Sequence, residues 1–121
     1  MRNDKENIIV EKTLEFSLLI MDFSELLESK KKFVLARQVL KSGTSIGANV
    51  REAQNAESKA DFIHKMKIAA KEADETEYWL LLCQLSSHYP DCEHLQEKLN
   101  EIIKILSKII SSSKVGHFQI S

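Results

Sequence analysis

Four long segments of this chain carry apolar side chains alternately three and four positions apart, the spacing that lines one face of an α-helix. The third stripe follows this rule without a fault and reads Phe62, Met66, Ala69, Ala73, Thr76, Leu80 and Cys83. The periodicity predicts helices over residues 8–29, 33–54, 59–87 and 92–113.

Turn-forming residues are scarce, since the 121 residues include three glycines and one proline. An all-β fold needs many turns, so this composition favours long helices with short connections. Pro90 marks one connection, because the residue before a proline avoids the helical region, and Asp91 is expected to cap the fourth helix. Ser58 and Asp61 resemble a capping box for the third. We predict an all-α, antiparallel up-down-up-down four-helix bundle, with residues 1–121 forming one domain.

The second predicted helix is weak at its centre, where Gly43 and Gly47 each cost about 1 kcal/mol relative to alanine. Small residues at this spacing also let a neighbouring helix approach closely. The alternative is that the helix breaks at Gly43.

Charge is unevenly distributed, although the net charge is only −1. Residues 30–51 contain six basic residues and no acidic one. Four of the basic residues share one side of a continuous second helix: Lys30, Arg37, Lys41 and Arg51. Such a stripe would extend for about 30 Å and suits RNA or DNA phosphates. The alternative is that it pairs with acidic residues of the first and third helices.

The segment from Tyr78 to Cys83 is apolar around the whole helix. A bundle buries only one side of each helix, and the side chains of Tyr78, Trp79 and Leu82 point away from the core stripe. A second copy of the chain is the simplest cover for them. We therefore predict a homo-oligomer with these three residues in the subunit interface.

Two D-x-x-H sequences, Asp61 to His64 and Asp91 to His94, have the ligand types of a metal site. Both aspartates fall at predicted helix starts, where carboxylates are favoured anyway, and His64 points outward. Cys83, His88, Cys92 and His94 gather near the third connection, but their spacing matches no zinc pattern, and both cysteines lie on apolar stripes.

One acidic residue of the third helix, Glu77, lies about 40° from the centre of the core stripe. We expect it to be buried and to have a partner on the second helix. The chain lacks a glycine-rich phosphate loop, a nucleophile elbow and an obvious carboxylate pair. We expect no metal, no cofactor, no catalytic residue and no small-molecule substrate. The alternative is a small metal-binding or enzymatic helical bundle.

Residues 1–7 are polar, and no apolar run is long enough for a signal peptide or a membrane span. We expect a cytoplasmic protein that does not bind membranes and whose two cysteines are free thiols.

Two stretches of the sequence resemble a known family. Lys41-Ser42-Gly43-Thr44-Ser45-Ile46-Gly47-Ala48-Asn49-Val50-Arg51-Glu52 resembles its R-S-x-x-S-I-x-A-N-I-x-E-G pattern. Phe62 and the run from Ile68 to Leu80 are similar to its F-x(5)-I-A-x-K-E-A-x-E-T-x-Y-W-L pattern. The family comprises four-helix bundle proteins encoded in intervening sequences of bacterial large-subunit ribosomal RNA genes. Ala53 departs from the pattern, which has glycine at that position.

The resemblance covers about residues 8–110 and implies a four-helix bundle that assembles into rings of five subunits. It also relates the chain to the accessory variability protein of diversity-generating retroelements, which binds nucleic acid through a basic surface. No member is known as an enzyme. We therefore expect a non-enzymatic homo-oligomeric scaffold, with a pentamer implied by the resemblance, that binds structured RNA or a ribonucleoprotein through the basic stripe.

Overall fold

The computed structural model describes residues 8–114; residues 1–7 and 115–121 lie outside its described part. The described residues form four α-helices: α1 (Ile8–Ser29), α2 (Phe33–Ala53), α3 (Lys59–Leu85) and α4 (Glu93–Lys114). The predicted all-α fold is confirmed, and each helix begins and ends within two residues of its predicted position.

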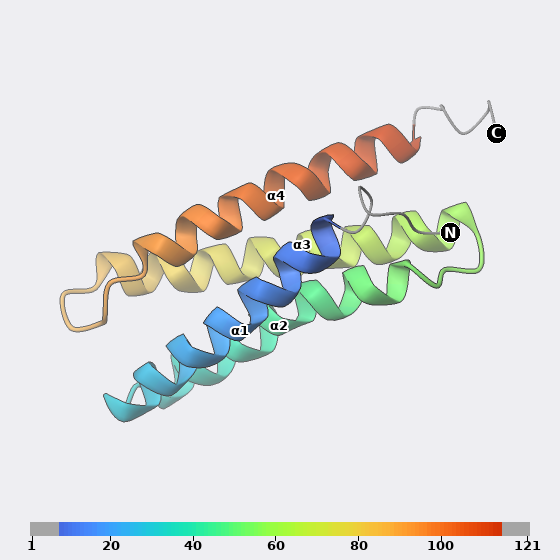
Figure 1. Cartoon of the computed structure of the whole chain (residues 1–121). Helices are drawn as coiled ribbons and strands as arrows, with labels where there is room; N and C mark the ends of the chain where they lie inside the picture. Colours follow the sequence, from blue (N-terminus) through green and yellow to red (C-terminus); the bar gives the residue numbers. More distant parts are fainter. Residues whose placement is uncertain (1–7, 115–121) are drawn as a thin grey trace.

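The helices run alternately up and down, each beside the next one in the chain (Figure 1). α2 packs most extensively, against both α1 and α3, whereas α4 contacts α3 less and α1 least. Within residues 8–114, α1 and α3 share no close backbone contact, so they occupy one diagonal of the bundle. The outer surface of α2 therefore lies between the outer surfaces of α1 and α3.

The core is built from the predicted stripes. Phe16, Ile20, Ile46, Met66 and Leu80 are all completely or almost completely buried, as are Ala69 and Ala73 of α3. On α4 the buried residues are Leu95, Leu99, Ile102 and Leu106. A continuous apolar centre of this kind is what drives four amphipathic helices together.

The α2 helix is continuous through both glycines, so the predicted alternative of a break at Gly43 is wrong. A Cβ atom on Gly43 would lie 2.9 Å from Cγ2 of Ile20, and one on Gly47 would lie 3.3 Å from the Ser17 hydroxyl oxygen. The Ser24 hydroxyl also donates a hydrogen bond to the Ala36 carbonyl across the same interface. The close approach of α1 and α2 therefore requires glycine at position 43.

The turn between α1 and α2 closes with a Schellman motif. The Lys32 N–H donates to the Leu27 carbonyl at 2.8 Å, and the Lys31 N–H donates to the Glu28 carbonyl at 2.8 Å. Lys31 has a φ of 63°, the left-handed conformation that this motif usually gives to glycine. The turn thus tolerates a strained lysine.

The start of α3 confirms the predicted cap. The Ser58 hydroxyl accepts a hydrogen bond from the Asp61 N–H at 3.0 Å. The Asp61 carboxylate accepts from the Glu57 N–H, one residue earlier than in a standard capping box.

At the other end of α3, the helix stops at Leu85, two residues before its predicted end. The Gln84 side chain connects α3 to α4, since its amide donates to Asp91 and its carbonyl oxygen accepts from the Cys92 N–H. Asp91 is thus held chiefly by Gln84, and its 3.5 Å contact with the Glu93 N–H is a weak cap.

Candidate nucleic-acid interface

Three of the four predicted basic residues share the outer surface of α2. Arg37, Lys41 and Arg51 are exposed, and Lys30 is exposed in the turn that precedes the helix. Thr44 and Ala48 complete the spacing between Lys41 and Arg51. We call Lys30, Arg37, Lys41 and Arg51 the α2 stripe. Its helical part, from Arg37 to Arg51, spans about 21 Å, shorter than predicted because Lys30 lies outside the helix.

Within residues 8–114, the stripe does not form the predicted ion pairs with acidic residues. The ion pairs among residues 8–114 join Lys12 to Glu101, Lys65 to Glu52 and Lys98 to Glu15. None of them uses a residue of the α2 stripe. The four residues are therefore exposed and outside the ion pairs of residues 8–114.

Lys41 is the member of the stripe with an acidic residue nearby. Burial raises the pKa of the Glu72 carboxyl, and the negative charge of Glu75 raises it further, while Lys41 opposes both effects. Lys41 therefore acts on the Glu72 carboxyl through its charge, and the residue is exposed.

The two stretches that carry the family resemblance meet across the α2–α3 interface. The hydroxyl oxygens of Ser42, in the first stretch, and Thr76, in the second, lie 2.8 Å apart, and both residues are buried. The Asn49 amide donates to the Ser45 carbonyl, one turn earlier in α2. The polar residues of the first motif thus hold the bundle together, while its exposed positions carry the basic groups.

A comparison with known proteins supports the family resemblance of these two stretches. The profile of the 23S rRNA-intervening sequence protein family matches residues 5–108. This chain belongs to that family. A search of curated proteins found no match.

A crystal structure at 1.70 Å from Bacteroides thetaiotaomicron, described as a protein of unknown function from the S23 ribosomal protein family, is similar to this chain. The two chains are 45% identical, with a TM-score of 0.81, over 85% of this chain and 98% of the other.

The predicted interface residues on α3 divide into two kinds. Tyr78 is 54% exposed and Leu82 is 37% exposed, and Leu85 beside them is 75% exposed. Trp79 instead is partly buried against the core, and its indole N–H donates to the Glu75 carboxylate at 3.3 Å. The prediction that Trp79 cannot reach the core is therefore wrong. We call Tyr78, Leu82 and Leu85 the α3 patch.

One exposed apolar surface, on α1, was not predicted from the sequence. Leu14, Leu18 and Met21 are 56%, 55% and 47% exposed, and they follow one another four and three positions apart. We call these residues the α1 ridge. Its periodicity was visible in the sequence, but it lies opposite the stronger core stripe of Phe16 and Ile20.

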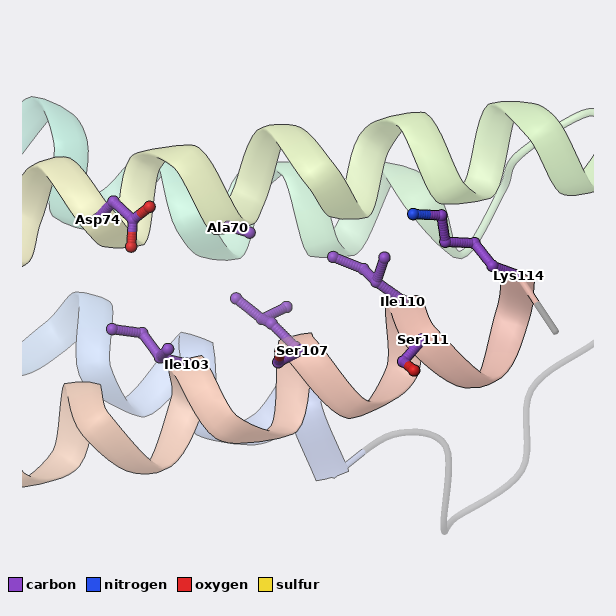
Figure 2. Close-up of a pocket in the computed structure, with 8 residues that line it drawn as sticks. Ala70, Asp74, Ile103, Ser107, Ile110, Ser111 and Lys114 are labelled. Atoms are coloured by element: carbon purple, nitrogen blue, oxygen red, sulfur yellow. The ribbon is translucent and has the colours of Figure 1, made fainter.

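An open groove of about 560 Å³ lies between α3 and the last turns of α4. Figure 2 shows Ile110 pointing from α4 towards α3, with Asp74 and Ile103 at one end of the groove and Lys114 at the other. A second, smaller groove is lined by Glu77, Glu93 and Glu97. Glu77 is exposed and borders α4, so the prediction that it is buried with a partner on α2 is wrong.

The predicted alternative metal ligands do not converge. His64, His88 and His94 are exposed, whereas Cys83 and Cys92 are buried free thiols. Burial raises the pKa of Cys83 to about 11, and burial with the nearby charges of Cys83 and Asp91 raises that of Cys92 to about 12. Among the described residues, no three His, Cys, Asp or Glu side chains are grouped to hold a metal ion. None of the described helices is long and apolar enough to cross a membrane.

Proposed function

We propose that this family member is a non-catalytic, self-associating scaffold that binds structured RNA through the α2 stripe. The observation that carries the proposal is that Arg37, Lys41 and Arg51 are exposed on one line of a continuous helix and make no ion pair within residues 8–114. Phosphate groups are the natural partners of such unpaired cations, because binding them releases counterions.

We propose that the stripe contacts the phosphate backbone of the RNA and does not read a particular base sequence. The stripe carries two arginines and two lysines, and one aromatic side chain, Phe33, is exposed one turn before Arg37. The spacing from Arg37 to Arg51 is about 21 Å, long enough to follow several phosphates of one strand.

Self-association is the second part of the proposal. Tyr78 and Leu82 are 54% and 37% exposed in the single chain, and contiguous apolar surface of this kind marks interaction sites. We propose a ring with five copies, the number implied by the family resemblance, and a mass of about 70 kDa from 13.9 kDa chains. Several stripes on one particle would strengthen binding to a long RNA.

The test is fluorescence anisotropy with a labelled base-paired RNA hairpin at low salt. The double variant Arg37→Glu, Lys41→Glu is expected to lose binding while keeping its helical circular dichroism. The matched control is Lys104→Glu, Lys108→Glu, which reverses two exposed α4 lysines with the same four-residue spacing. This control should bind as the wild type does. Equal losses in the two double variants would mean that only net charge matters, and a wild type that does not bind the hairpin would refute RNA binding.

A further inference from the structure

Phe33 is an aromatic side chain that the fold leaves exposed and without a partner for its ring. It is the first residue of α2 and is 50% exposed. Within residues 8–114 its ring packs on no other aromatic ring and lies under no cation. The other aromatic side chains of these residues are buried in the core, packed against it or in contact with another ring: Phe16, Phe23, Phe62, Tyr78, Trp79 and Tyr89.

The position of Phe33 continues the α2 stripe by one turn. Phe33 precedes Arg37 by four positions, and Lys30 lies three positions before it. At 3.6 residues per turn, Phe33 points about 40° away from Arg37 and in about the same direction as Arg51. The exposed ring therefore lies between two exposed cations, on the same side of α2 as the stripe.

Positive charge prevails around this ring, although carboxylates lie nearby. The turn before it contains three lysines, residues 30–32, and Arg37 follows one turn later. The last turns of α1 carry the exposed Glu25 and Glu28, and Asp91 lies in the connection between α3 and α4. Residues 78–85 at the end of α3, which packs on α2, carry no charge. The cations are thus in excess, and they belong to the same turn and helix as the ring.

An aromatic ring between cations is the arrangement with which proteins hold a strand of nucleic acid. The cations follow the phosphates, and the ring stacks on a base. The phosphate contacts proposed for Arg37 and Lys41 would bring an RNA strand within one helical turn of Phe33. A base that is already paired has its faces covered by its neighbours, so the base at Phe33 has to be an unpaired one.

We propose that Phe33 stacks on one unpaired base of the bound RNA, while Arg37 and Lys41 contact the phosphates of the adjoining stem. This inference rests on the proposed RNA binding and specifies the kind of RNA, a base-paired stem with an unpaired nucleotide beside it. Stacking accepts every base, because each has a flat π face. The contact therefore adds selectivity for RNA structure without reading a base sequence.

The experiment compares the affinities of two labelled RNA duplexes by fluorescence anisotropy at low salt. Each duplex has one bulged nucleotide, an adenosine in the first and an abasic sugar-phosphate in the second, so both present the same number of phosphates. The wild type is expected to bind the adenosine bulge at least about five-fold more tightly, because one stacked base is gained. Phe33→Ala should bind the two duplexes equally, with the wild-type affinity for the abasic one. Phe33→Tyr should keep the preference.

Tyr78→Ala is the matched control, since Tyr78 has a similarly exposed ring on α3, away from the stripe. It should keep the preference for the adenosine bulge. The readout is the ratio of two affinities, so a change in self-association that weakens both equally leaves it unaltered. Phe33 is half exposed, so Phe33→Ala should keep the helical fold. Phe33→Leu, which is apolar but has no ring, repeats the test if circular dichroism shows that the alanine variant is unfolded.

A wild type that binds both duplexes equally, or a Phe33→Ala variant that keeps the preference, would overturn base stacking and leave phosphate binding standing. If that variant keeps the preference and has a lower mass on a sizing column, Phe33 contacts protein and not RNA. A wild type that binds neither duplex at low salt would instead refute RNA binding, and base stacking with it.

Discussion

Gly43 of α2 lies directly against Ile20 of α1, so closely that an added Cβ atom would meet Ile20 Cγ2 at 2.9 Å and Cγ1 at 3.0 Å. Ile20 is fully buried and β-branched, and it cannot turn aside easily. Gly47, one turn later, has more room, since its nearest atoms would lie at 3.3 Å. Position 43 therefore has less room for a side chain than position 47.

Alanine substitution at each of the two glycines should therefore affect stability differently. Either change gains about 1 kcal/mol in helix propensity, but overpacking at Gly43 should cost about 1–3 kcal/mol. We expect Gly43→Ala to be less stable than Gly47→Ala by about 1–2 kcal/mol, measured by urea unfolding. Equal stabilities would mean that α1 and α2 are further apart than described here.

Lys31→Gly should stabilise the protein. Lys31 adopts a φ of 63°, which costs a side-chain-bearing residue about 1 kcal/mol, and glycine recovers part of this in spite of its greater freedom when unfolded. The neighbouring variant Lys30→Gly removes the same charge without relieving a positive φ and should be neutral or destabilising. Thermal unfolding of both variants checks this, and a lower melting temperature for Lys31→Gly than for Lys30→Gly would contradict it.

The buried hydroxyl pair between α2 and α3 gives an asymmetric prediction. Thr76 has a single hydroxyl proton, and the Glu72 carbonyl lies 2.8 Å from its oxygen, so the Ser42 proton is the one shared between the two hydroxyls. Thr76→Val then leaves Ser42 buried without a partner and should cost about 1–3 kcal/mol. Ser42→Ala should cost less, because Thr76 keeps its bond to Glu72.

The double variant Ser42→Ala, Thr76→Val completes this cycle. It should be no less stable than Thr76→Val alone, since no unpaired hydroxyl remains. Purely additive losses in denaturant unfolding would show that the pair contributes no coupling.

The raised pKa values of the cysteines predict a loss of stability at alkaline pH. An unfolded cysteine ionises near pH 8.5, whereas the pKa values of Cys83 and Cys92 in the fold are about 11 and about 12. Above pH ~9 the unfolded chain releases protons that the native chain retains, so the free energy of unfolding falls as pH rises towards 11. The Cys83→Ala, Cys92→Ala variant should show a shallower fall in urea midpoint between pH 8 and pH 10.5. Parallel slopes would contradict this account.

The helix limits were predictable because each core stripe is long and periodic, and because Ser58 and Pro90 mark two of the boundaries. The continuity of α2 was harder to predict from the sequence. The low helix propensity of Gly43 is offset only by its close contact with Ile20, which lies on another helix. The bridge from Gln84 to Asp91 and Cys92 joins an exposed helix position to a loop, and no local pattern indicates it.

The two errors on α3 have a common cause. A helical wheel gives the direction of a side chain but not the distance of the neighbouring helix. α4 packs less extensively on α3 than α2 does, so Glu77 borders an open groove and is exposed. On the side of α2 the packing is tighter, and Trp79 reaches the core. Trp79→Ala would therefore weaken the fold as well as any interface, which makes Leu82 the better position to test.

The most direct test of the proposed function is the salt dependence of RNA binding. About four phosphate contacts per subunit predict that log K falls with log salt concentration at a slope of about −3 to −4. Neutralising Arg37 and Lys41 to glutamine should lower the magnitude of the slope by about 2, whereas the same change at Lys104 and Lys108 should leave it unaltered. A slope that does not change in the Arg37, Lys41 variant would show that the RNA binds elsewhere, and the absence of any binding at low salt would contradict the RNA-binding function itself.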